Sequence, residues 1–135
     1  MEFDHADPAA GEMREQYAPH FEGTARFQDF VSPFADRGGP AVFAVHFEAG
    51  ARTRPHVHRS GQVLYITDGT GVLGYEDGTR FVQPGDVVTV EPGEWHWHGG
   101  TPGSAMSHLT VQLPGFEDVE WNVDDRDWAT NYPEP

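Results

Sequence analysis

The chain of 135 residues contains no cysteine and no lysine. Disulfide bonds, thiolate ligands and cysteine nucleophiles are excluded, so any metal ion must be bound through nitrogen and oxygen atoms. All eight basic residues are arginines, and 22 acidic residues give a formal net charge of -14. A surface this acidic repels nucleic acid and anionic membranes, so we expect neither as a partner.

Long hydrophobic runs are also absent. No segment approaches the roughly 20 apolar residues of a membrane-spanning helix, and the N-terminal region has no apolar stretch typical of a signal peptide. We therefore expect a soluble cytoplasmic protein. The length suits one domain with its own hydrophobic core.

Turn-forming residues are abundant and separate short segments of strand composition. The 16 glycines and 11 prolines disfavour long helices. Strand patterns occur at Thr24–Val31, Ala41–Gly50, Gln62–Thr67, Gly71–Glu76, Thr79–Val82, Val87–Val90 and Ala105–Leu113. Their spacing predicts an all-β protein, a sandwich or barrel of about six to eight antiparallel strands.

Two turns are expected to close hairpins within this barrel. Asp68-Gly69-Thr70 would join the strands on either side of it, and Asp77-Gly78 is a strong tight-turn signal. The strand at Thr24–Val31 is our candidate for an edge that pairs with a second subunit.

The barrel is expected to occupy residues 24–116. Residues 1–23 are broken by prolines and predict an irregular arm, with at most a helical turn at Gly11–Tyr17. Residues 117–135 predict an acidic tail that packs on the barrel through Trp121 and Trp128.

Histidine placement is the most informative pattern in the chain. His56 and His58 are separated by one residue, and so are His96 and His98. Because side chains alternate along a strand, each pair directs two imidazoles to one face of a sheet. Two such pairs on neighbouring strands can enclose a metal ion.

Glycines at fixed spacings on either side of these histidines define two motifs. They read Gly50-x5-His56-x-His58-x3-Gln62-x6-Gly69 and Gly85-x5-Glu91-Pro92-Gly93-x2-His96-x3-Gly100. Together they resemble the two signature motifs of the cupin superfamily, over about residues 50 to 100. The resemblance implies a single-domain cupin, an antiparallel β-barrel or jelly roll, with a divalent metal bound by His56, His58, Gln62 and His96.

Gln62 stands where most cupins have glutamate, while Glu91 and Gly100 replace a usual proline and asparagine. A neutral amide leaves the charge of a divalent metal undiminished, which makes the metal a stronger Lewis acid. It also removes a carboxylate that would stabilise a higher oxidation state. Gln62 therefore favours redox-neutral Lewis-acid chemistry over oxygen chemistry, although an amide is the weaker ligand.

A narrower resemblance covers FEAGARTRPHVH, SGQVLYIT, PGDVVTVEPGEWHWHG and TPGSAMSHLTVQ. These stretches are similar to a subgroup of single-domain bacterial cupins that includes manganese-dependent hydroxynitrile lyases, in which the fourth ligand is also glutamine. The resemblance implies manganese as the first candidate metal, then iron, with zinc, nickel or cobalt after them. Two further histidines carry protons in these lyases, and they correspond to His98 and His108.

Strand alternation leads to the same two residues independently of the resemblance. If His96 faces the metal, His98 faces the same cavity, and Trp97 points away. His108 belongs to the polar face of the strand at Ala105–Leu113. An imidazole titrates near neutral pH and suits acid–base catalysis. We expect His5, His20 and His46 to lie at the surface.

The leading hypothesis is a metal-dependent lyase that cleaves or forms a carbon–carbon bond next to an aldehyde, with His98 and His108 as acid–base groups. A non-haem iron dioxygenase would use the same metal ligands. An isomerase or lyase of sugar or lactone chemistry would differ only in its substrate, and a non-catalytic, metal-containing module would bind a ligand without turnover. In each case the partner is a small molecule, and we expect a homodimer.

Overall fold

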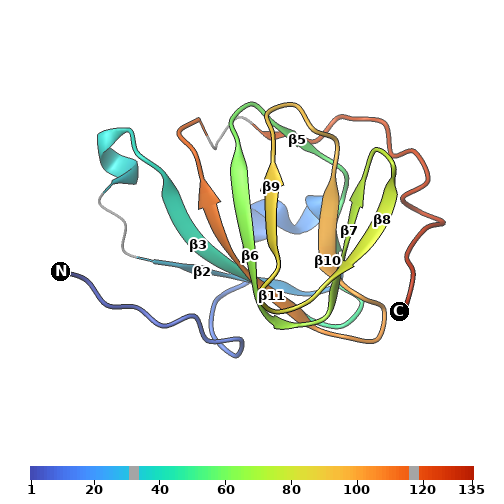
Figure 1. The fold of residues 1–135 in the computed structure, drawn as a ribbon, viewed down its shortest axis with the longest axis horizontal. Coiled ribbons are helices and arrows are strands. Elements are labelled where there is room, and N and C mark those ends of the chain that lie inside the picture. Colours follow the sequence, from blue (N-terminus) through green and yellow to red (C-terminus); the bar gives the residue numbers. More distant parts are fainter. Residues whose placement is uncertain (31–33, 116–118) are drawn as a thin grey trace.

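The computed structural model describes residues 1–30, 34–115 and 119–135, and almost all of its regular structure is antiparallel β-sheet. Two five-stranded sheets lie on either side of an interior space (Figure 1). The prediction of an all-β fold of antiparallel strands is confirmed. Among the described residues no helix is long and apolar enough to cross a membrane.

The first sheet has the order β1 (Phe21–Glu22), β4 (Arg52–Thr53), β10 (Trp97–Gly100), β7 (Gly71–Tyr75) and β8 (Gly78–Val82). The second has the order β2 (Ala25–Asp29), β3 (Ala41–Phe47), β11 (Met106–Gln112), β6 (Gln62–Gly69) and β9 (Val87–Val90). A separate pair joins β12 (Val119–Glu120) to β5 (Val57–His58). Two short 3-10 helices, η1 (Glu15–His20) and η2 (Ala35–Arg37), complete the described structure.

The hydrophobic core fills one end of the space between the sheets. Phe47, Ile66 and Met106 are almost completely buried there. Towards the other end, the inward positions of β11 become polar, with His108, Thr110 and Gln112 paired in register with Ile66, Leu64 and Gln62 of β6. The same strands therefore supply an apolar core and a polar cavity, because their inward faces change character along their length.

The predicted hairpin across Asp68-Gly69-Thr70 is wrong. β6 pairs with β9 and β11 in one sheet, whereas β7 pairs with β8 and β10 in the other. The chain crosses between the sheets at this glycine, which has φ +74°, and a Cβ on it would lie 2.0 Å from the Ala105 carbonyl oxygen. A glycine suited to a turn is equally suited to such a crossing. The Asp77-Gly78 hairpin is confirmed by the pairing of β7 with β8.

The N-terminal segment pairs with the candidate edge strand. Of the predicted strand Thr24–Val31, the structure has β2 at Ala25–Asp29, and Val31 lies outside the described residues. Glu12 forms an isolated antiparallel bridge with Phe27 on the outer edge of β2. Part of the edge expected to meet a second subunit is therefore paired within the chain. The helical turn lies at Glu15–His20 rather than Gly11–Tyr17.

His46 is buried, which corrects the expectation that it lies at the surface. Its Nδ1 lies 2.7 Å from the Ser107 hydroxyl, and its Nε2 lies 3.0 Å from Gln28 Oε1. The Gln28 amide in turn donates to the His5 carbonyl of the N-terminal segment. The N-terminal segment therefore helps to cover His46 and to hold its hydrogen-bond partner Gln28 in place. Strand alternation could not reveal this contact. Of the remaining two histidines expected at the surface, His5 is exposed and His20 is half-buried.

The C-terminal residues pack on the outer face of the first sheet around a buried arginine. The Arg52 guanidinium lies 4.0 Å from the ring centre of Trp128 and 4.1 Å from that of Tyr132. Its Nε forms an ion pair with Glu22, and its Nη1 donates to the Trp128 carbonyl. Trp97, on the outward side of β10, packs against Trp128. The expected boundary between barrel and tail, at residues 116 and 117, lies outside the described residues.

Candidate metal centre

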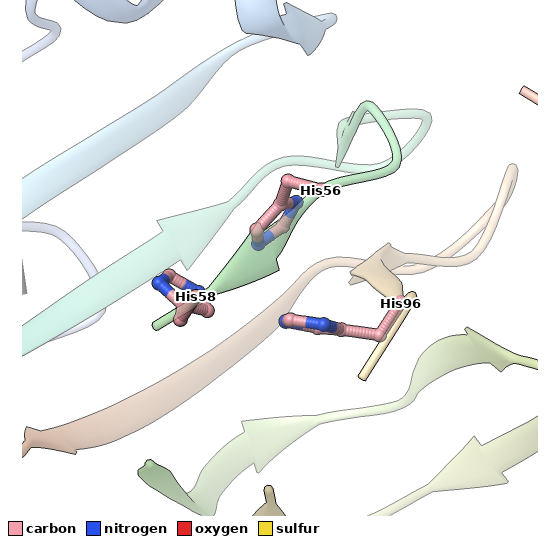
Figure 2. A group of neighbouring side chains, drawn as sticks. All are labelled: His56, His58 and His96. Carbon is pink, nitrogen blue, oxygen red and sulfur yellow. The ribbon is translucent and has the colours of Figure 1, made fainter. Parts of the chain in front are cut away.

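Three histidines from two separate segments converge at the polar end of the barrel. His56 immediately precedes β5, His58 ends it, and His96 immediately precedes β10. The backbones of His56 and His96 form an isolated antiparallel bridge, which brings the two motifs together. One ring nitrogen from each histidine lies within 4.8 Å of the others, a spacing that could hold a metal ion. Figure 2 shows the three rings directed at a common space.

Backbone carbonyls determine which nitrogen faces that space. His56 Nδ1 donates to the Arg54 carbonyl at 2.8 Å, and His96 Nδ1 donates to the Glu94 carbonyl at 2.9 Å. Because a carbonyl only accepts, the proton of each neutral ring is on Nδ1 and the lone pair is on Nε2. Among the described residues, neither His96 Nε2 nor either nitrogen of His58 has a hydrogen-bond partner. Such buried lone pairs are what a metal ion requires.

Burial keeps these three imidazoles neutral. Desolvation lowers the pKa of His58 and of His96 to about 4. It lowers the pKa of His56 well below its ordinary value, with further lowering from the neighbouring His96 and His58. At neutral pH all three are therefore in the form that can bind a metal.

Gln62 begins β6 and lines the same cavity as His56 and His58. Its Nε2 donates to Gln112 Oε1 at 2.9 Å. Its Oε1 is buried and has no hydrogen-bond partner within the described part of the chain. A buried, unsatisfied carbonyl oxygen is costly unless a ligand completes it. The donor set of three imidazole nitrogens and one amide oxygen fits a divalent transition metal.

His98 and His108 form a hydrogen-bonded pair beside the three-histidine group. His108 Nε2 lies 3.0 Å from His98 Nδ1, and His108 Nδ1 lies 3.1 Å from the Thr110 hydroxyl oxygen. The His98 ring is parallel to that of His96, with centres 5.7 Å apart, as alternation along β10 predicts. Desolvation lowers the pKa of His108 to about 3 and that of His98 well below its ordinary value, with His108 and nearby histidines adding to the effect on His98.

An aromatic cavity of about 360 Å³ extends from these polar groups. Its aromatic lining consists of Tyr17, Phe21, Phe27, Phe30, Phe43 and Trp121. Sequence reasoning missed this lining. Phe43 lies on β3, but the other aromatic residues come from η1, from the short β1, from β2 and the residue after it, and from the C-terminal tail.

Trp121 is the clearest example of what the sequence did not reveal. Its ring contacts those of His20 and His56, with centres 4.3 Å and 4.5 Å away. The residue follows β12, which pairs with β5 and so holds the tail beside His58. Packing of Trp121 on the barrel was expected, but its contact with the histidine cluster has no local sequence signal.

A model of the cupin domain matches residues 43–111, which include both histidine motifs and β11. The chain belongs to the cupin family. It is 44% identical over 110 residues to an (R)-mandelonitrile lyase of Granulicella tundricola, covering 77% of this chain and 80% of the relative.

Solved structures agree with this family. A cupin-like protein of Thermotoga maritima superposes with a TM-score of 0.76 at 25% identity, covering 98% of this chain and all of that one. The polyketide cyclase RemF of Streptomyces resistomycificus has the same TM-score at 19% identity, covering 94% of this cupin and 89% of the cyclase. The second likeness shows the fold alone. The family prediction is confirmed, and the histidine group indicates a site for a divalent metal.

Proposed function

We propose that this cupin is a metal-dependent lyase that cleaves or forms the carbon–carbon bond of a cyanohydrin. The observation that carries the proposal is the division of five buried histidines in one region. Three have ring nitrogens within 4.8 Å of one another, while His98 and His108 are hydrogen-bonded to each other. The similarity to a mandelonitrile lyase supports the choice of reaction.

His56, His58, His96 and Gln62 would hold the metal. Their donor atoms are neutral, so they leave the charge of the ion undiminished. A divalent ion bound there, with manganese as the first candidate and iron the second, would supply Lewis-acid polarisation of a substrate hydroxyl or carbonyl oxygen. The chain's own contribution is a site of buried side chains whose ligand atoms are already close together.

The histidine pair is assigned to proton transfer. Both ring nitrogens of His108 are engaged, one by His98 and one by Thr110. His98 Nε2 is therefore the nitrogen left to exchange a proton with a substrate. In the cleavage direction it would take the hydroxyl proton, the carbon–cyanide bond would break with its electron pair on cyanide, and an aldehyde would remain. Protonation of cyanide then gives hydrogen cyanide and restores the neutral pair.

The aromatic lining suits a substrate that has a neutral apolar ring. Phe21, Phe43 and Trp121 offer faces and edges on which such a ring packs. The polar histidines lie beside this lining, so an aryl ring packed on it would place an attached hydroxyl close to them. An aromatic cyanohydrin of the mandelonitrile type meets both conditions.

An assay of mandelonitrile cleavage with an oxygen electrode in the same vessel tests this function. The lyase should release benzaldehyde and cyanide in equal amounts, at the same rate with and without oxygen. Oxygen consumption coupled to turnover of a small organic substrate would instead identify a dioxygenase. Metal binding without turnover of any cyanohydrin would favour a binding module.

A further inference from the structure

Gln112 is a buried polar residue to which the proposed reaction gives no role. It lies on β11 directly opposite Gln62 of β6, and both side chains are at most about one-twentieth exposed. The two amides bond to each other at 2.9 Å. A buried pair of amides is retained only when every donor and acceptor has a suitable partner, so its orientation is informative.

The direction of this hydrogen bond follows from a backbone carbonyl. Gln112 Nε2 lies 3.3 Å from the Gly61 carbonyl oxygen, which can only accept. The amide nitrogen of Gln112 must therefore face Gly61, and its Oε1 must face Gln62. Gln62 can form a hydrogen bond to the Gln112 oxygen only through its Nε2, which is the donor. Its own Oε1 therefore points away from Gln112. This assignment rests on donor and acceptor chemistry, which distinguishes the two ends of each amide.

We propose that Gln112 is a positioning residue that presents the oxygen, rather than the nitrogen, of Gln62 to the metal. The inference rests on the proposed metal site and deepens it. An amide nitrogen has no lone pair to give, so a rotated Gln62 would not be a ligand. Rotation would also place two oxygens against each other in a buried site, which is unfavourable.

The same arrangement explains why residue 62 is not glutamate. Gln112 Oε1 requires a donor from its neighbour, and an ionised carboxylate has none. A glutamate there would face the oxygen of Gln112, unless Gln112 turned and left the Gly61 carbonyl opposite another oxygen. Gln112 and Gly61 together therefore select the amide.

The test is the affinity of the metal-free protein for Mn²⁺ alone, measured by titration calorimetry. Gln112→Met keeps the length of the side chain but removes the hydrogen bonds of its amide to Gln62 and Gly61, together with the weaker one to Ser60. We expect Mn²⁺ to bind about 10- to 100-fold more weakly, as for other residues that orient a ligand. The electron paramagnetic resonance spectrum of bound Mn²⁺ should change as well, which loss of stability alone would not cause.

A double-mutant cycle tests whether Gln112 affects Mn²⁺ binding through Gln62. In a Gln62→Ala background, Gln112→Met should have no further effect on Mn²⁺ affinity. Ser60→Ala is the matched control. It removes a weaker contact to Gln112 at 3.4 Å and leaves the Gly61 carbonyl in place, so affinity should stay within about twofold.

Unchanged Mn²⁺ affinity in Gln112→Met would overturn the inference about Gln112, but it would leave the proposed metal site unaffected. An equal loss in the Gln62→Ala background would overturn it too, because Gln112 would then act by another route. If Gln112→Met does not fold, Gln112→Leu, which also lacks both amide groups, takes its place, and unchanged Mn²⁺ affinity there would contradict the inference. A wild-type protein that binds no divalent metal would refute the proposed function, and the inference with it.

Discussion

At the scale of single residues, His96 and His98 lie two positions apart and differ in the partner of the ring nitrogen Nδ1. His96 Nδ1 is held by a carbonyl, which leaves Nε2 for a metal. His98, two residues later, is hydrogen-bonded to His108 and does not belong to the three-histidine group. The partner of Nδ1 distinguishes a candidate ligand from a candidate acid–base group.

His98→Ala should separate the proposed metal-binding role of His96 from the proposed acid–base role of His98. We expect Mn²⁺ affinity to stay near that of the wild type, while kcat for cyanohydrin cleavage falls about 100- to 10,000-fold through loss of the proton acceptor. The control is His46→Gln, which alters a buried histidine that does not line the cavity. Its kcat per folded molecule should be unchanged. Full turnover by His98→Ala would remove His98 from the mechanism.

At the scale of elements, the cavity depends on segments outside the strands that carry the histidines. Trp121 follows β12 and contacts both His20 of η1 and His56. The two terminal regions of the chain therefore meet over the candidate metal centre. Substrate selection should be sensitive to this contact.

Trp121→Ala should weaken the binding of aromatic substrates. The loss of one aromatic contact predicts a KM about 3- to 10-fold higher, with a smaller effect on kcat, at saturating metal. Trp95→Ala is the matched control. The Trp95 ring packs against Arg126, and its Nε1 donates to the Asp124 backbone carbonyl. Trp95 does not line the cavity. Equal effects of the two substitutions would show that Trp121 has no special contact with substrate.

The crossing between β6 and β7 predicts a strong requirement for glycine at position 69. Gly69→Ala would force a Cβ to within 2.0 Å of a backbone oxygen at a φ of +74°. We expect a loss of about 2–4 kcal/mol in the free energy of unfolding, measured by urea titration. At Gly93, with φ +80° and no atom within 4 Å of an added Cβ, alanine should cost only about 1 kcal/mol. Similar losses at both positions would contradict the proposed close packing.

At the scale of the whole molecule, the sequence predicted what depends on local periodicity and missed what depends on distant contacts. Alternation along β10 and β11 correctly placed His98 and His108 in one cavity. It could not show that the chain leaves one sheet for the other after β6, because a crossing glycine resembles a turn glycine. The burial of His46 likewise depends on a segment about 40 residues earlier in the chain.

The buried histidines also predict a pH-dependent stability of the metal-free protein. In the unfolded chain they titrate near 6.5, whereas burial lowers the pKa of His58 and His96 to about 4. Below about pH 6.5 the unfolded state therefore binds more protons than the folded state, and stability falls as pH falls towards about 4. Urea unfolding over this range should show proton uptake on unfolding. The free energy of unfolding should change less steeply with pH in His108→Asn than in the wild type. An unchanged steepness would contradict the burial of His108 as a neutral imidazole.

The function proposed for this cupin depends on a divalent metal bound through His56, His58, His96 and Gln62. A calorimetric titration of the metal-free, untagged protein with Mn²⁺, repeated with His96→Ala, measures that binding without relying on any substrate. We predict saturation at one ion per chain and loss of that binding in the variant. A wild-type protein that takes up neither Mn²⁺, Fe²⁺ nor Zn²⁺, or a variant that binds as well as the wild type, would contradict the assignment.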